Sequence, residues 1–208
     1  MTEVLAVLLA MLALIAVRRF TRLFAVIAGG LLMVSCATSG LPLVSVADAN
    51  SGMTQGYRIA GGDKIKVAVF DEPTLTGEFA VGLDGSLSLP LIAPIQSAGL
   101  MPEQIAAKIA ASLTEGGFVL SPRVTVEVSQ HRPFYILGEV TAPGEYPYIG
   151  DLTVEQAIAK ARGYTPRANK SEVVLRRQGW SEGRRVRLGT SPLLIAPGDT
   201  VTVLEAFF

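Results

Sequence analysis

AGGDKIKV, residues 60–67, and APGDTVTV, residues 196–203, are two versions of one short pattern. In each, a Gly-Asp pair precedes residues that alternate between polar and apolar, which predicts a turn leading into a half-buried β-strand. The two turns are Gly62-Asp63 and Gly198-Asp199, and an aspartate in such a turn can accept hydrogen bonds from backbone amides. The pattern therefore predicts a strand after each turn, with a structural role for the turn and no chemistry attached to it.

The first copy of the pattern begins a segment, residues 57–130, that combines short strands with one helix. Asp84-Gly85 lies between apolar alternating residues and predicts a hairpin, because glycine supplies the positive φ that a tight turn needs. Pro102 suits the first position of a helix, and apolar residues then recur at four-residue spacing up to Gly116-Gly117. An alternating strand over 124–128 completes this segment.

The second segment, residues 131–208, has the same kinds of element. We expect a strand over 134–140, followed by a turn in which Pro143 presets φ and Gly144 takes the left-handed conformation. Thr153 and Gln156 form a capping-box pair at the start of a helix that ends near Gly163. Further strands are expected over 173–177, 184–188, 193–195 and 201–204. Both segments are therefore predicted to be small, β-rich α+β domains with one main helix each.

Residues 1–35 differ in composition from the rest of the chain. They hold two apolar runs, 4–17 and 23–34, separated by the basic residues Arg18, Arg19 and Arg22. Each run is shorter than the roughly 20 apolar residues of a transmembrane helix, and the second has the length of a signal-peptide core behind its basic segment. We predict a signal peptide in residues 1–35, with residues 1–16 as an over-extended start. A hairpin of two short membrane segments is the alternative.

Cys36 is the only cysteine of the chain, so it cannot form an internal disulfide. Met33, Val34 and Ser35 precede it, which resembles the lipobox of bacterial lipoproteins with methionine in place of the usual leucine. A thiolate can take a diacylglyceryl group, and two or more acyl chains give stable membrane attachment. We predict lipidation of Cys36, and a buried cysteine in an uncleaved membrane anchor is the alternative. The small and polar composition of residues 36–56 predicts a flexible tether after the lipid.

Charge and composition exclude several classes of function. The formal net charge is +0 for the whole chain and about −2 without residues 1–35, which gives no indication of nucleic-acid binding. His131 is the only histidine, so the sequence predicts no metal site and no cofactor. Glu127, Ser129 and His131 lie at one strand end rather than on converging elements, and carboxylate pairs such as Asp71 and Glu72 are common in turns. We expect no catalytic residue.

A group of basic residues lies on the predicted hairpin of residues 173–188. It consists of Arg176, Arg177, Arg184, Arg185 and Arg187, with Trp180 at the tip of the hairpin. The arginines can attract an acidic polysaccharide or the acidic face of a partner, and a tryptophan can stack on a sugar or anchor an interface. A solvated strand edge that resists unwanted pairing is the alternative. These six residues are the candidate polymer- or partner-binding residues.

Several of these motifs together resemble a known family. Tyr57-Arg58-Ile59, Gly62-Asp63, Glu78, Asp84-Gly85, Leu89-Pro90 and Gly99 resemble the polysaccharide export domain of outer-membrane exporters of the Wza and GumB type. Residues 134–188, with Val140-Thr141-Ala142-Pro143-Gly144-Glu145-Tyr146 after Gly138-Glu139, resemble the β-grasp-like SLBB domain that follows it in that family. The resemblance implies an export domain over 57–130, then an SLBB-like domain and C-terminal strand over 131–208.

The resemblance implies a ring of identical lipoprotein subunits on the periplasmic face of the cell outer membrane, through which a capsular or extracellular polysaccharide leaves the cell. The implied partners are the polysaccharide, further copies of the chain, an inner-membrane polysaccharide co-polymerase and the outer membrane, which Ala37 after Cys36 favours over the inner membrane.

Long members add further SLBB domains and a pore helix, so this sequence resembles a short form. We expect Phe207 and Phe208 in core packing or a subunit contact, or else at the membrane interface. The other hypothesis is a periplasmic carbohydrate-binding or scaffold lipoprotein that forms no conduit.

Overall fold

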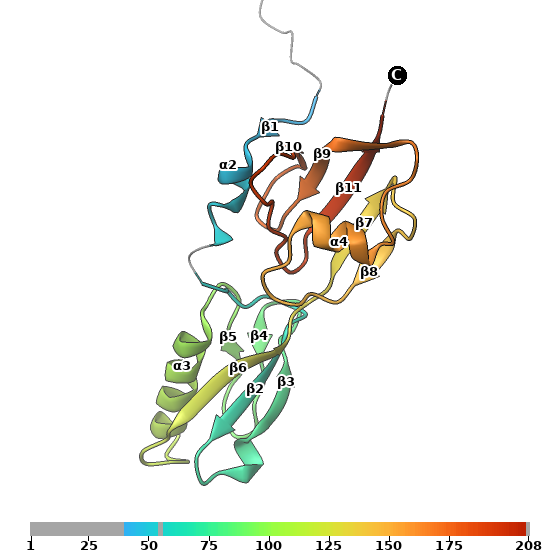
Figure 1. Cartoon of the computed structure of the whole chain (residues 1–208). Helices are drawn as coiled ribbons and strands as arrows, with labels where there is room; N and C mark the ends of the chain where they lie inside the picture. The colour runs from blue at the N-terminus through green and yellow to red at the C-terminus, as the bar shows by residue number, and fades with distance from the viewer. Residues whose placement is uncertain (1–39, 54–55, 207–208) are drawn as a thin grey trace, which may run out of the picture. The chain divides into compact units, whose positions relative to one another are not determined.

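The computed structural model describes residues 40–53 and 56–206 (Figure 1). From Leu41 onward the chain forms one compact unit with two hydrophobic cores. The predictions for the signal peptide, for lipidation of Cys36 with its lipobox (Met33, Val34 and Ser35), and for Phe207 and Phe208 concern positions outside the described residues.

The first core belongs to residues 57–130, here called the first domain. Its main sheet is antiparallel, with the order β3 (Gly77–Ala80), β2 (Lys64–Val69), β6 (Val124–Gln130). Alternate residues of β2 are buried and the others face outward, which confirms the period-two pattern that predicted this strand. A register shift next to Lys64 marks a bulge where β2 begins to pair with β6.

One helix covers the first sheet. Helix α3 (Pro102–Glu115) starts at the proline, as predicted, and buries Ile105, Ile109 and Leu113 in the first core. The backbone N–H of Met101 donates to the side chain of Gln104 at 2.9 Å, which satisfies one free amide at the helix start. A short 3-10 helix, η2 (Pro73–Leu75), connects β2 to β3.

The Asp84-Gly85 turn forms, but the segments on either side of it pair less extensively than the predicted hairpin. Gly85 has a φ of 81°, and the Asp84 carboxylate accepts a hydrogen bond from the Ser86 N–H at 3.0 Å. Only an isolated bridge joins Val81 to Leu87 across this turn. Strand β4 (Ser86–Leu87) instead pairs with β5 (Ile95–Gln96) as a separate two-stranded sheet.

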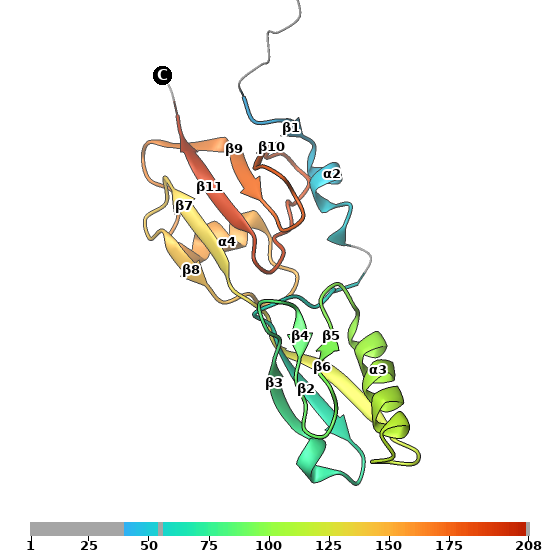
Figure 2. The same cartoon turned by 180° about the vertical axis from the view of Figure 1, so that it is seen from behind.

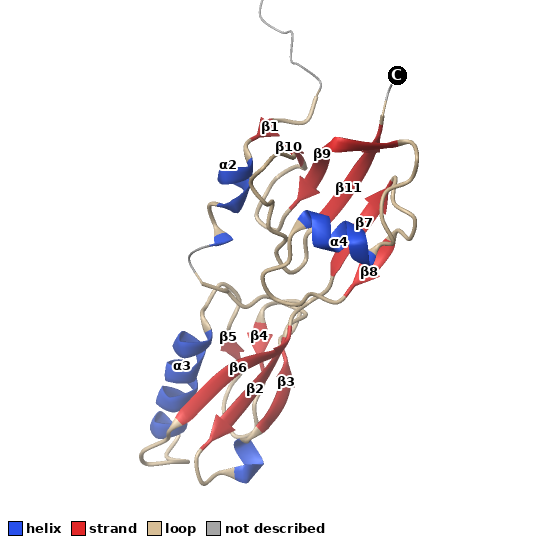
Figure 3. Ribbon diagram, viewed as in Figure 1, coloured by secondary structure: helices blue, strands red, loops and turns tan. Residues whose placement is uncertain are grey.

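The second domain is built on a mixed six-stranded sheet. The strand order is β1 (Leu43–Val44), β10 (Arg184–Arg187), β9 (Ala168–Arg176), β11 (Thr200–Glu205), β7 (Phe134–Gly138), β8 (Gly144–Tyr146). Helix α4 (Val154–Lys160) lies across one face of this sheet, and Figure 2 shows the opposite face with no helix over it. The Thr153–Gln156 capping box at the start of α4 is present as predicted. Both domains are thus α+β, which confirms the predicted fold class (Figure 3).

The prediction of a flexible tether over residues 36–56 is wrong for residues 43–50. These residues form β1 and helix α2 (Val46–Asn50), and both belong to the second domain. Val44 pairs with Val186, and Ala49 is buried in the second core. The Asn50 side chain donates to the Pro192 carbonyl at 2.9 Å and accepts from the Leu194 N–H at 3.0 Å. The second domain is therefore discontinuous, with residues 41–50 joining residues 134–206.

Two smaller predictions in the second domain are also wrong. Gly144 is not left-handed: it begins β8 opposite Ile136, and the left-handed glycine of this region is Gly138, with a φ of 83°. Residues 193–195 form no strand, because only an isolated bridge joins Leu194 to Thr153. Leu193 and Ile195 are nevertheless fully buried in the second core.

Candidate functional site

The two Gly-Asp turns have the same local structure. In each, one carboxylate oxygen of the aspartate accepts a hydrogen bond at 2.8 Å from the backbone N–H three residues earlier, Ala60 for Asp63 and Ala196 for Asp199. Both aspartates are fully buried. A buried carboxylate needs a cationic partner, and each turn has an arginine supplied from elsewhere in the chain.

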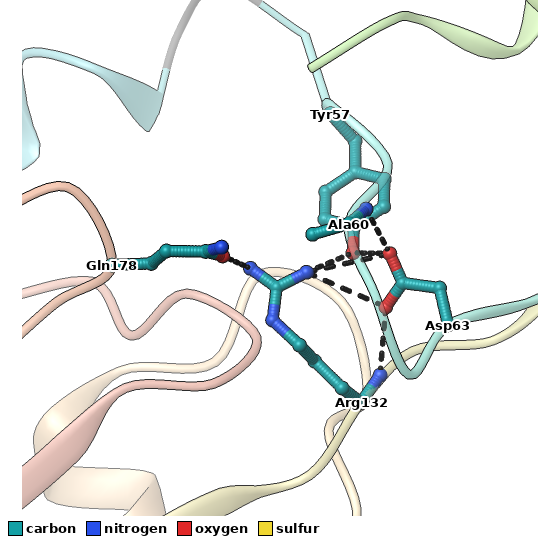
Figure 4. Close-up of polar contacts among 5 residues, drawn as sticks. All are labelled: Tyr57, Ala60, Asp63, Arg132 and Gln178. Carbon is teal, nitrogen blue, oxygen red and sulfur yellow. Dashed lines mark hydrogen bonds and ion pairs between the residues drawn. The ribbon is translucent and has the colours of Figure 1, made fainter. Parts of the chain in front are cut away.

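In the first turn, Asp63 is held by Tyr57 and Arg132 (Figure 4). The Tyr57 hydroxyl donates to Oδ2 of Asp63 at 2.5 Å, and the Arg132 backbone N–H donates to Oδ1 at 2.9 Å. The guanidinium of Arg132 pairs with Asp63 at 3.3 Å and also donates to Gln178 Oε1 at 2.8 Å. Burial, followed by the hydrogen bond to Asp63, raises the pKa of Tyr57, so the phenol remains a donor. Arg132 thus links the first turn to the β9–β10 loop of the second domain.

In the second turn, Arg177 joins three parts of the second domain. Its guanidinium pairs with Asp199 at 2.7 Å and donates to the Leu194 carbonyl at 2.9 Å and the Ala49 carbonyl at 2.5 Å. Burial raises the pKa of the Asp199 carboxyl, and the hydrogen bond and charge of Arg177 oppose that shift. This arginine therefore fixes helix α2 and the second turn to the end of β9.

Next to these turns lies a cavity of about 550 Å³. Its lining combines the rings of Tyr57, His131 and Tyr148 with the polar side chains of Asp151 and Gln178. The His131 ring meets both tyrosines edge-on, with centroid distances of 4.4 Å and 5.3 Å. Over the part of the chain that the structure describes, no group of three or more His, Cys, Asp or Glu residues could hold a metal ion. Aromatic rings with a few polar groups suit binding of a ligand.

His131, which lines this cavity, is predicted to make the stability of the folded chain depend on pH. Within the described residues its Nδ1 atom is buried without a hydrogen-bond partner, and burial lowers the pKa of its imidazole below the ordinary value of 6.5, against an opposing effect of Asp63. The unfolded chain then binds more protons than the folded one, so the free energy of unfolding should fall as the pH drops from about 6.5 through the folded pKa. Because the chain has one histidine, an NMR titration of its ring protons measures this pKa directly. A midpoint at or above 6.5 would contradict the prediction, and His131→Asn should remove the contribution of this imidazole to the slope.

The six candidate residues of the basic hairpin do not form one patch. Arg177 forms an ion pair with Asp199 in the second turn, and Arg185 pairs with Glu172. The Arg184 guanidinium lies over the Trp180 ring, 4.1 Å from its centroid. Three arginines of the hairpin have no carboxylate within ion-pair distance among the described residues: Arg176, Arg184 and Arg187.

The sequence patterns did not identify three residues that line the cavity: Arg132, Tyr148 and Gln178. Each lies in a loop without periodicity, and Arg132 is 69 residues away from Asp63 along the chain. The repeated Gly-Asp pattern gave a signal for the two aspartates but none for the residues that pair with them. Among the described helices, none is long and apolar enough to cross a bilayer.

Comparison with known proteins bears on both domains. Residues 51–129 match the family model described as polysaccharide biosynthesis/export protein, and residues 133–188 match the SLBB domain. Over 144 residues the chain is 34% identical to the exopolysaccharide production protein ExoF of Rhizobium meliloti (strain 1021). That alignment covers 63% of this chain and 34% of the relative, so the chain spans about a third of the relative's length. The matches confirm the resemblance that the sequence motifs predicted.

Proposed function

This chain belongs to the polysaccharide biosynthesis/export protein family, and on that premise we propose that it is a lipid-anchored component of an exopolysaccharide export machine. It acts on the periplasmic face of the outer membrane, where identical copies form a ring through which the polymer passes. Its partners are an inner-membrane polysaccharide co-polymerase, the polysaccharide and the outer membrane. It has no catalytic role.

One observation carries this proposal: an export domain is followed directly by an SLBB domain in the same chain. A relative that is 34% identical over 144 residues is named for exopolysaccharide production. The turns that hold Asp63 and Asp199 support a rigid structural subunit, since their buried polar groups bond to one another. Lipidation of Cys36 and the ring rest on the lipobox and on the family resemblance.

The export proposal is tested with a deletion strain and full-length variants. We expect the deletion to abolish secreted polysaccharide and the wild-type gene to restore it. Cys36→Ser should restore little, because the chain would lack the acyl chains that give stable attachment. Secreted polymer is measured by sugar analysis of the medium, alongside immunoblots that show equal amounts of each variant.

Met33→Leu is the matched control for Cys36→Ser. It gives the lipobox its usual leucine and should support normal secretion. Undiminished secretion by the deletion strain would contradict an export role. Full rescue by Cys36→Ser would contradict the anchor but leave export intact.

A scaffold or carbohydrate-binding lipoprotein is the second candidate, favoured by the cavity beside Tyr57, His131 and Tyr148. A conduit needs a closed ring with head-to-tail interfaces, whereas a binding protein can act as a monomer. The mass of the detergent-extracted chain distinguishes the two. A monomeric mass together with normal secretion by the deletion strain would favour the scaffold.

A further inference from the structure

A second, smaller recess lies beside the two Gly-Asp turns. Its volume is about 380 Å³, within the range of about 300–1,000 Å³ that is usual for small-molecule sites. It shares Arg132, Arg177 and Gln178 with the larger cavity. Its other lining residues are Gly61, Arg176, Gly179, Trp180, Gly198 and Thr200. Among the described residues, the lining of this recess thus includes three arginines and no aspartate or glutamate.

The second turn holds the Arg132 side chain at this recess. A Cβ placed on Gly198 would be 2.6 Å from Nε of Arg132, so the guanidinium crosses the turn where only a glycine leaves room for it. Nη1 of Arg132 bonds to Tyr57 and Asp63, and Nη2 donates to Gln178 (Figure 4). Its Nε–H has no hydrogen-bond partner among the described residues. Arg132 therefore has one donor left for a ligand.

The recess has an excess of positive charge. Two of its arginines, Arg132 and Arg177, are neutralised by the buried aspartates of the turns. Arg176 is exposed at the end of β9 and has no carboxylate within ion-pair distance among the described residues. The guanidinium of Arg184, equally unpaired there, lies 4.1 Å from the centroid of the Trp180 ring. Unpaired cations around a recess favour an anionic ligand.

The donors of the recess match a carboxylate carried on a sugar ring. A guanidinium binds a carboxylate through two parallel hydrogen bonds, which gives geometric specificity as well as charge attraction. Thr200 lies opposite Arg176 in the β9–β11 pair, and its hydroxyl can both donate to and accept from a sugar hydroxyl. A group specific for the anion thus lies beside a neutral polar group.

We propose that this recess binds the carboxylate of a uronic acid unit of the exported polysaccharide, with Arg176 as its charged contact and Thr200 bonding to the same sugar. This inference rests on the proposed export function, which supplies the polymer. It joins part of the basic hairpin to Arg132 and Thr200, which lie outside that hairpin. A phosphate has related chemistry, so inorganic phosphate is one of the ligands in the test.

Trp180 is the only tryptophan and lines the recess, so its fluorescence reports binding without a label. The full-length chain, in a polyoxyethylene detergent that has no charge and no sugar headgroup, is titrated with four ligands. They are the trisaccharides of galacturonate and of glucuronate, neutral galactotriose, and inorganic phosphate. We expect a saturable change with an acidic trisaccharide and none with galactotriose. Phosphate binding as tight as that of the acidic trisaccharides would overturn the assignment to a sugar.

Arg176→Gln should weaken binding of the acidic trisaccharide by more than about tenfold, because it removes a charge-assisted donor. Arg187→Gln is the matched control, since it removes the same charge from the same hairpin outside the recess. Arg187 lies opposite Glu172, four residues along β9 from Arg176, which is about 13 Å. That exceeds the screening length of about 10 Å at 0.1 M salt, so this variant should bind like wild type. Equal losses in the two variants would overturn the assignment to this recess.

Binding and secretion together separate the recess from the function on which it rests. If neither acidic trisaccharide changes the fluorescence while the deletion strain still loses secreted polymer, the recess is overturned and export stands. If an acidic trisaccharide binds while the deletion strain secretes normally, the saccharide site is supported and the export function is overturned. That second outcome would favour the carbohydrate-binding lipoprotein.

Discussion

Replacement of Arg177 by alanine is expected to lower the free energy of unfolding by about 3–5 kcal/mol, because it leaves the Asp199 carboxylate buried without its cation. Asp199 is fully buried and the Arg177 side chain is only 12% exposed, so the pair is largely shielded from solvent. The substitution also removes the donors to the Leu194 and Ala49 carbonyls. Helix α2 would lose one of the contacts that hold it to the second domain.

Denaturant unfolding of Arg177→Ala against wild type measures this loss. Arg176→Ala is the matched control, since Arg176 is the exposed neighbour at the end of β9 and its loss should change stability by less than about 0.5 kcal/mol. Arg177→Met with Asp199→Asn should cost less than the sum of the two single changes, because the pair acts as a unit. A loss below about 1 kcal/mol for Arg177→Ala would show that the pair does not hold the second turn.

The elements that the sequence predicted correctly are those whose signal is local. Strand β2 alternates buried and exposed residues, and helix α4 carries its capping box within four residues. The tether prediction failed because β1 and α2 gain their stability from distant partners. Val44 pairs with Val186, and Asn50 bonds to Leu194, about 140 residues along the chain. A five-residue helix has no stability of its own that a composition argument could detect.

The candidate site also combines residues that have a local sequence signal with residues that have none. The repeated Gly-Asp pattern identified Asp63 and Asp199 as turn residues, and their side chains bond to backbone amides in those turns. Nothing in the pattern identifies the arginines that neutralise them. Arg177 was grouped with Arg176 because they are adjacent, yet Arg176 is the exposed last residue of β9, whereas Arg177 lies in the loop after β9 and pairs with the buried Asp199.

Replacement of Gly138 by alanine is expected to lower the free energy of unfolding by about 2–5 kcal/mol. After Arg177→Ala, this is the second of the two largest losses of stability expected. Gly138 ends β7 with a φ of 83°, where a side chain costs about 1–2 kcal/mol. A Cβ there would also lie 2.1 Å from the carbonyl oxygen of Val203 on β11, and overpacking of this kind costs about 1–3 kcal/mol more. That carbonyl accepts the Glu139 N–H at 3.0 Å, so it cannot move away without loss of a hydrogen bond between the strands.

Two other glycines of the second domain separate these contributions. Gly163 has a φ of 87° but no atom within 4 Å of the position of a Cβ, so Gly163→Ala should cost only the conformational part, about 1–2 kcal/mol. Gly144 has open space and no positive φ, so Gly144→Ala should change stability by less than about 0.5 kcal/mol. Thermal or denaturant unfolding of the three variants gives the ranking. Equal losses for Gly138→Ala and Gly163→Ala would mean that β7 and β11 can separate enough to admit a methyl group, and that their close approach is not what requires glycine at residue 138.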